Sequence, residues 1–215
     1  MREGRGDNRR IFCEDMEACI LAAIREETDI EGVAFENGIL PEGIYPELTF
    51  RNCSFLSCRF LSADLERIGL LDCTLKLCDF SNSVMKKASI QRTSFDNCKL
   101  MGADLAECYM MDVTMADCAA SYVNLSGSKL QHASFRHTDL TGCGLGGCKL
   151  SKPVFAACKL TRAELFGTSM KGVDLSTSEL GGVSMAGQEL RGAIVNTDQA
   201  AMLGRMLAGV LVKDD

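Results

Sequence analysis

A large apolar residue recurs at every fifth position over most of this chain. The series begins at Phe50, ends at Val195 and has 30 members, and Ala120 is the only member that is not a large apolar residue. A period of five matches neither the 3.6-residue repeat of an α-helix nor the two-residue alternation of a flat strand. A backbone that turns side chains inward at this period changes direction every five residues, so we expect a solenoid.

A second series, two residues earlier, holds small side chains. It also has 30 members, of which 26 are Ala, Cys, Ser, Thr or Val. One large and one small inward residue per five fits a four-sided coil of twenty residues, whose successive coils pair as strands about 4.8 Å apart. We therefore predict an all-β fold, a right-handed quadrilateral β-helix over residues 47–196, with roughly 7.5 coils and a length on the order of 36 Å.

A twenty-residue coil leads to two further predictions. Each central residue should pack on the residues twenty positions away, as Phe95 would on Leu75 and Met115. Glycine is frequent two residues after the central position, as at Gly102 and Gly142, where a tight corner favours a positive φ.

The chain has twelve cysteines, and ten of them lie in the small inward series. These ten are Cys53, Cys58, Cys73, Cys78, Cys98, Cys108, Cys118, Cys143, Cys148 and Cys158. One interpretation is a metal site or a ladder of disulfides, and the other is a set of small buried hydrophobic side chains. We favour the second, because parallel stacking keeps the Cβ atoms slightly too far apart for a bridge. The only two histidines, His132 and His137, fall at solvated corners.

No catalytic signature accompanies the repeat. The sequence has no phosphate-binding glycine loop, no nucleophile elbow and no Cys–His pair at a useful spacing. Its carboxylates are spread over outward positions. We therefore expect a binding protein and not an enzyme, with no cofactor and no metal.

The N-terminal part departs from the repeat. Residues 1–10 are charged, are not followed by the apolar segment of a signal peptide, and are expected to be disordered. Residues 11–46 are expected to form a cap over the first coil that contains a short helix or irregular structure. No apolar run approaches the ~18 residues that span a bilayer, so we expect a cytoplasmic protein without a membrane partner.

Residues 197–215 are expected to form a C-terminal cap. Thr197 would be the N-cap residue of a helix that ends at Gly209, and residues 210–212 would form a short apolar strand. This apolar surface is larger than a cap over the last coil requires, so we predict that it joins two copies of the chain. The dimerisation residues would be Met202, Leu203, Met206, Leu207, Val210, Leu211 and Val212.

The uninterrupted register over residues 48–195 resembles that of the pentapeptide repeat family. Three stretches are similar to the loopless Qnr and MfpA branch: IYPELTFRNCSF at 44–55, DCAASYVNL at 117–125, and LRGAIV at 190–195, with DQA three residues after it. The resemblance implies a dimeric rod, joined at its C-terminal ends, that mimics duplex DNA. It also implies that the partners are DNA gyrase and topoisomerase IV, protected from quinolones or altered in supercoiling. The loops that interrupt the coils of plasmid-borne Qnr proteins have no counterpart in this register.

A mimic of DNA needs negative charge on its surface, so the distribution of outward charges along the rod is relevant to this resemblance. Residues 47–197 carry 15 acids and 16 bases, so the rod is not acidic as a whole. The side through Leu65 and the opposite side through Phe55 lean acidic, whereas the side through Phe50 carries seven bases against three acids. A DNA-binding surface would prefer the acidic sides. The candidate partner-binding residues on them are Asp64, Glu66, Asp96, Asp104, Glu107, Asp117, Glu164 and Asp174.

Two functions follow. The first is a DNA-mimicking dimer that binds a topoisomerase. The second is a repeat scaffold that binds another protein through outward apolar residues, which are Leu56, Leu61, Leu71, Met101, Tyr109, Met111 and Tyr122. The basic side lacks the interleaved aromatic residues of single-strand binders, so direct contact with nucleic acid is not expected.

Overall fold

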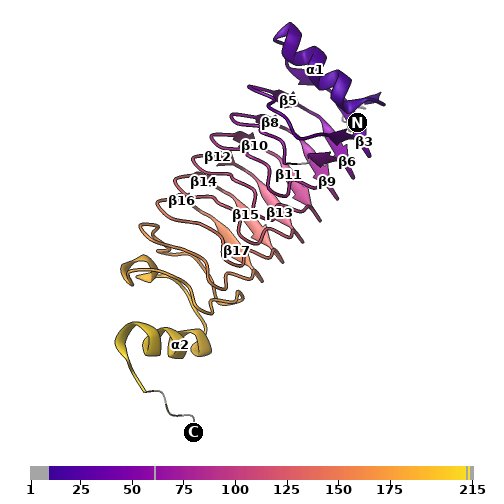
Figure 1. Cartoon of the computed structure of the whole chain (residues 1–215). Coiled ribbons are helices and arrows are strands. Elements are labelled where there is room, and N and C mark those ends of the chain that lie inside the picture. Colours follow the sequence, from indigo (N-terminus) through magenta and orange to yellow (C-terminus); the bar gives the residue numbers. More distant parts are fainter. Residues whose placement is uncertain (1–9, 61, 212, 214–215) are drawn as a thin grey trace, which may run out of the picture.

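The computed structural model describes residues 10–60, 62–211 and 213. The backbone winds as a four-sided β-helix that forms a rod, with helix α1 at one end and helix α2 at the other (Figure 1). The predicted fold class is confirmed. We number the four sides of the coil by one central residue each: Phe50 for side 1, Phe55 for side 2, Phe60 for side 3 and Leu65 for side 4.

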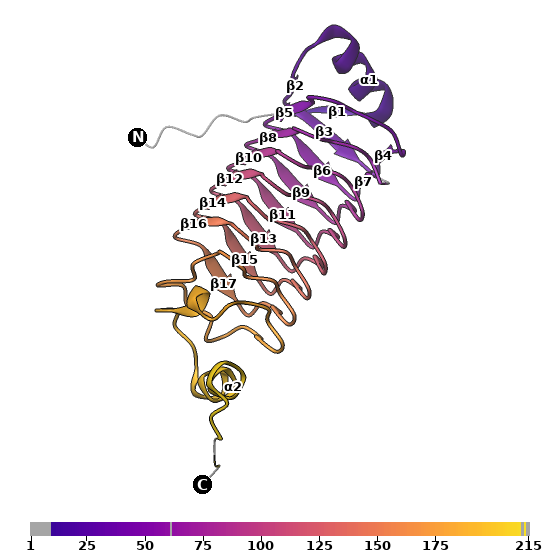
Figure 2. The same ribbon diagram turned by 60° about the vertical axis from the view of Figure 1, so that its left-hand side comes forward.

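Parallel sheets cover sides 1 and 2 along most of the rod (Figure 2). From the N-terminal end, side 2 holds β1 (Ile11–Cys13), β3 (Val33–Glu36), β6 (Ser54–Leu56), β9 (Thr74–Lys76), β11 (Ser94–Asp96), β13 (Thr114–Ala116), β15 (Ser134–Arg136) and β17 (Val154–Ala156). Side 1 holds β2 (Ile30–Glu31), β5 (Thr49–Arg51), β8 (Gly69–Leu71), β10 (Ser89–Gln91), β12 (Tyr109–Met111), β14 (Lys129–Gln131) and β16 (Lys149–Ser151). Side 3 begins with β4 (Ile39–Leu40) and β7 (Arg59–Phe60), and single bridges continue sides 3 and 4.

The core is a set of stacks that run along the rod axis. Phe95 pairs in register with Leu75 on one coil and Met115 on the next, and it has no exposed surface. The rings of Phe60 and Phe80 stack with centroids 4.1 Å apart. The predicted twenty-residue register is therefore confirmed, and burial of these side chains from water is the main stabilising term.

The corners explain how the chain turns every five residues. Gly102 and Gly142 adopt φ values of 67° and 65°, as predicted for these positions. Most corners are nevertheless occupied by other residue types in the same left-handed region, such as Asn97 at 51°. The backbone N–H of Asn97 donates to the carbonyl of Ala116 on the next coil at 3.0 Å, and such a bond offsets the conformational strain.

The β-helix begins earlier than residue 47. Ile30, Phe35, Leu40 and Tyr45 continue the central series toward the N-terminus and are buried, and β2, β3 and β4 pair with the following coil. The N-terminal cap is consequently smaller than the predicted residues 11–46. It consists of β1 and of α1 (Met16–Glu26), whose buried residues lie over the first coil.

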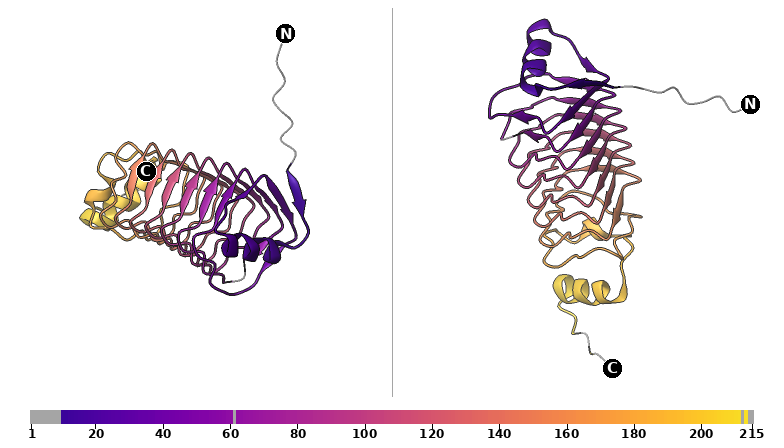
Figure 3. Two further views of the ribbon diagram at one scale, coloured as in Figure 1. Left: turned by 90° about the horizontal axis from the view of Figure 1, so that it is seen from above. Right: turned by 90° about the vertical axis from the view of Figure 1, so that its right-hand side faces the viewer.

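The C-terminal end contains the short 3₁₀ helix η1 (Gln188–Leu190) and α2 (Thr197–Ala208), which lies across the end of the rod (Figure 3). Asn196, and not the predicted Thr197, is the N-cap residue. Its side chain accepts from the N–H of Gln199 at 2.9 Å, and the Gln199 side chain accepts from the N–H of Asn196 at 2.8 Å. The reciprocal pair decides the position of the cap.

Gly209 ends α2 with a φ of 63°, as predicted. Residues 210 and 211 do not form the predicted strand, because a strand needs a neighbour to pair with and α2 already lies across the last coil. Val212 lies outside the described residues. With eleven and twelve residues, α1 and α2 are too short to cross a membrane, and no longer apolar helix occurs in the described residues.

Candidate partner-binding surfaces

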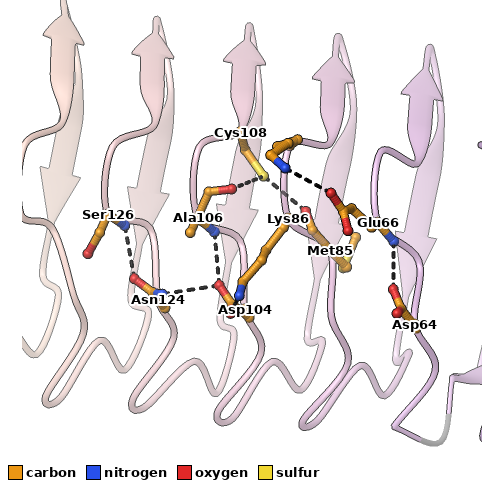
Figure 4. A network of polar contacts seen from close by, with 10 residues as sticks. Asp64, Glu66, Met85, Lys86, Asp104, Ala106, Cys108, Asn124 and Ser126 are labelled. Atoms are coloured by element: carbon orange, nitrogen blue, oxygen red, sulfur yellow. Dashed lines mark hydrogen bonds and ion pairs between the residues drawn. The ribbon is translucent and has the colours of Figure 1, made fainter.

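On side 4, the coil that carries Lys86 and Lys87 lies between the coil of Asp64 and Glu66 and the coil of Asp104 and Glu107. Lys86 forms an ion pair with Asp104 at 3.1 Å (Figure 4). Lys87 forms an ion pair with Glu66 at 3.0 Å. The ion pair with Lys87 holds the pKa of the Glu66 carboxyl below its usual range, so this group stays charged. Two of the predicted acidic residues of side 4, Glu66 and Asp104, are therefore paired with lysines at the rod surface, where such pairs contribute little to stability.

Some carboxylates of side 4 also accept hydrogen bonds from backbone N–H groups. Asp64 accepts from the N–H of Glu66 at 3.1 Å, and Asp104 accepts from the N–H of Ala106 at 3.2 Å (Figure 4). A short acidic side chain just before the central residue can close a local turn by this bond. Asp104 also accepts from the amide of Asn124 on the next coil at 3.1 Å. These bonds orient the carboxylates along the rod surface.

Side 4 keeps an excess of carboxylate after its ion pairs form. All three of its bases are paired with acids of the same side, the third being Arg67 with Glu47 at 3.4 Å. Among the predicted residues, Glu107 and Glu164 remain exposed, without an ion pair to any described residue.

The predicted residues of side 2 behave similarly. Asp96 lies 3.3 Å from Lys76 in an ion pair, whereas Asp117 and Asp174 are exposed, with no ion pair in the described part of the chain. Hydrogen bonds from the side chain and the backbone of Ser176 lower the pKa of the Asp174 carboxyl, which accepts from the N–H of Ser176 at 2.9 Å. The eight predicted residues thus form two opposite, elongated surfaces and not one compact site.

The sequence prediction missed the role of Lys86 and Lys87. Lys87 follows Glu66 by 21 residues and Lys86 precedes Asp104 by 18 residues. The twenty-residue period, applied to outward residues of opposite charge, would have found both pairs.

Helix α2 divides its apolar residues between the rod and solvent. Leu203 is buried against the rod, and the buried side chain of Gln199 donates to the carbonyl oxygens of Leu175 and Ser178 on the last coil. Leu203 is therefore a docking residue of its own chain and not a free dimer contact, because the face of the helix that carries it turns toward the coil. Met202 is half-buried against the core.

The remaining apolar residues of this end are exposed. Met206, Leu207 and Val210 are each between 43% and 49% exposed, and Leu211 is 96% exposed. Met202 and Met206 also line a groove beside α2, with a volume of about 530 Å³. These residues are the exposed part of the predicted dimerisation surface.

The ten inward cysteines are buried, as predicted. Burial raises the pKa of the Cys108 and Cys143 thiols to about 12. His132 lies at an exposed corner with Nδ1 3.0 Å from Asp112, and His137 is also exposed. No group of three potential metal ligands comes together within residues 10–60, 62–211 and 213.

The family model for the pentapeptide repeat region matches residues 88–143, and the same register continues on both sides of this stretch. A search of curated proteins finds no match to the chain. Similar solved structures include trypsin-treated QnrB1, a plasmid-mediated fluoroquinolone resistance protein, with 20% identity and a TM-score of 0.35 over 86% of this chain and 100% of that one. HetL of Nostoc, a pentapeptide repeat protein involved in heterocyst differentiation regulation, has 16% identity and a TM-score of 0.38 over 87% and 91%.

Proposed function

We propose that this pentapeptide repeat chain is a DNA-mimicking rod that acts as a dimer and binds the DNA-gripping surface of DNA gyrase and topoisomerase IV. One observation carries the proposal. Within the described residues, two opposite sides of a long rod carry exposed carboxylates that form no ion pair, at Glu107 and Glu164 on side 4 and at Asp117 and Asp174 on side 2. A surface that grips duplex DNA is complementary to two such rows of negative charge.

The length of the rod also supports the proposal. The eight strands of side 2 span roughly 34 Å at the usual strand spacing, and further coils extend the rod beyond β17. Two rods joined end to end would reach on the order of 80 Å, which is about two turns of B-DNA. The proposal therefore needs the dimer.

The direct test is gyrase from the native host, assayed for binding and supercoiling with and without a quinolone. We expect the protein to inhibit supercoiling at high concentration and to restore it in the presence of the drug at lower concentration. Glu107→Lys with Glu164→Lys should weaken binding, and raised salt should weaken it further through screening. The matched control is Glu42→Lys with Glu179→Lys, which makes the same change of charge on side 3.

Two results would contradict this proposal. Gyrase that shows neither binding nor altered supercoiling at micromolar dimer would exclude the topoisomerase function. An equal loss of binding in the control variant would exclude a specific role for the carboxylates of side 4 in the interface.

The dimer has its own test. Met206→Asp with Leu211→Asp places charges on the exposed apolar surface of the C-terminal end, so we expect light scattering to give the mass of a monomer where the unmodified protein gives that of a dimer. Unmodified protein that is monomeric at high micromolar concentration would remove this part of the proposal.

A second candidate function is a scaffold for another protein. It is favoured by Met101 and Tyr122, which lie on adjacent coils of side 3 and are 52% and 58% exposed. Met101→Ser with Tyr122→Ser should leave gyrase binding unchanged if the first function holds. It should abolish capture of the physiological partner if the second holds.

A further inference from the structure

The bases of side 1 fall into two groups that differ in their surroundings. In the N-terminal half each base has an acid nearby from the preceding coil. Arg51 lies 2.6 Å from Asp29, and Arg92 lies 2.7 Å from Asp72. Where the two halves meet, His132, on the same coil as Lys129, lies 3.0 Å from Asp112. Alternation of sign at the twenty-residue period neutralises this half of the side.

In the C-terminal half the same period repeats one sign. Its bases are Lys129, Lys149, Lys152, Lys171 and Arg191, all exposed, and none of them forms an ion pair within the described part of the chain. Lys129 at the start of β14 is the direct ladder neighbour of Lys149 at the start of β16. Like charges in register on neighbouring strands are destabilising, so folding does not account for this arrangement.

The acids that lie nearest to Lys171 and Arg191 in sequence, Asp174 and Glu189, form no ion pair with the five bases within the described residues. The Glu189 side chain is buried, and its carboxylate accepts from the N–H groups of Gly167 and Ala186 at 3.1 Å each. Asp174 belongs to side 2, where its carboxylate accepts from the N–H of Ser176. The five bases therefore present a cationic surface about three coil spacings, or roughly 14 Å, long.

The edge of the rod beside these lysines is formed by glycines, which have no side chain beyond hydrogen. Where side 4 turns into side 1, the first four corners from residue 47 are Glu47, Arg67, Lys87 and Glu107, and the next four are Gly127, Gly147, Gly167 and Gly187. A Cβ atom built on Gly147 would have no heavy atom within 4 Å, so this corner opens directly to solvent. The change from charged corners to glycine corners occurs at the coil where the unpaired lysines begin.

We propose that this surface, defined by Lys129, Lys149, Lys152, Lys171 and Arg191 and bordered by the glycine corner, binds the phosphate backbone of duplex DNA. Duplex DNA carries one negative charge per about 1.7 Å of its axis, hence about eight charges over the length of the surface. A bulky, stiff polyanion requires an unobstructed approach, which the glycine corner provides. This proposal departs from the expectation that the rod makes no direct contact with nucleic acid.

The structure favours a duplex over two other anionic partners. An acidic peptide is usually held by a groove or by a free strand edge. The strands of side 1 bond to each other, and both neighbours of β14 are occupied. Single-stranded nucleic acid needs aromatic platforms, and none of the outward residues of this half of side 1 is aromatic. Point charges on flexible stems over a flat face match non-specific phosphate contacts.

The test is fluorescence anisotropy of a labelled 20-base-pair duplex with the full chain and no topoisomerase, at several salt concentrations. We expect micromolar affinity at about 50 mM salt and a log–log salt slope of about −4, from four to five phosphate contacts. Lys149→Glu with Lys152→Glu should weaken binding by about tenfold or more and reduce the slope by about two.

The control variant is Lys99→Glu with Lys159→Glu, which makes the same change of charge on side 3 and should alter the affinity by less than about threefold. Thermal melts of both variants establish that they fold. Three results would overturn the proposal: no saturable binding at about 50 mM salt, an equal loss in the control variant, or displacement of the duplex by polyglutamate at equal charge concentration. The assay contains no topoisomerase, so its outcome is independent of the function proposed above.

Discussion

Phe95 and Asp96 are adjacent in sequence but face opposite environments, and this contrast allows a sharp test of the core. The Phe95 side chain is fully buried between Leu75 and Met115, with the ring of Phe80 edge-on at a centroid distance of 6.2 Å. Asp96 points outward, where its side chain is 41% exposed and forms an ion pair with Lys76. We compare Phe95→Ala with Asp96→Ala.

The expected magnitudes differ by several-fold. Removal of a buried phenyl ring costs about 3–5 kcal/mol, because apolar surface is lost and the closely packed stack leaves a cavity. Loss of an exposed ion pair costs about 0.2–1 kcal/mol. At roughly 2–4 °C per kcal/mol for a chain of this size, Phe95→Ala should lower the melting temperature by about 10 °C and Asp96→Ala by no more than about 4 °C.

Thermal melts followed by circular dichroism measure both changes. Solenoids sometimes lose cooperativity, so hydrogen exchange of the β9, β11 and β13 amides is the second readout, and Phe95→Ala should raise exchange there first. Equal losses of stability for the two variants would refute the inward and outward assignment. A larger loss for Asp96→Ala would refute it too.

Two further predictions concern titratable groups. With a thiol reagent at pH 8, the native protein should react at Cys13, and more slowly at Cys19, because burial raises the pKa of the Cys19 thiol to about 11. The ten inward thiols should react only on unfolding. Rapid labelling of an inward thiol in the native protein would contradict their burial. Arg92 holds the pKa of the Asp72 carboxyl below its usual range, so this pair contributes stability above the unfolded pKa of about 3.9 and loses it as pH falls through the lowered value. Asp72→Asn should therefore lower the unfolding midpoint slightly at pH 7 and leave it unchanged near pH 2, and an equal effect at both values would exclude the ion pair.

The core of this protein is predictable because one steric requirement recurs in every side of the coil. Each central position must fill the interior, and each position two residues earlier must fit beside the backbone of the next coil. The first coil was missed for a physical reason. Gly38 occupies one of its four small positions, and a Cβ atom there would lie 2.8 Å from the Cβ atom of Met16 in α1. The position is adapted to the capping helix, so it does not match the composition of the later coils.

At the C-terminal end the sequence predicts the apolar residues of the helix but not the orientation of the helix on the rod. Its apolar residues were identified from helical spacing, but that spacing does not say which face meets the rod. The contact is decided by Gln199, a polar residue, which bonds the free carbonyl groups of the last coil and turns Leu203 inward. Buried polar groups need partners, and here those partners come from residues about twenty positions earlier in the chain.

The outward surface obeys a different constraint from the core, and the twenty-residue period makes the difference visible. Stability alone favours opposite charges on successive coils, which is the pattern of Asp72 with Arg92. Lys129 and Lys149 repeat one sign in register instead. Since the same coiled backbone and the same buried central series serve both halves of side 1, the fold does not require this repetition, and a partner that supplies negative charge gives it a physical reason.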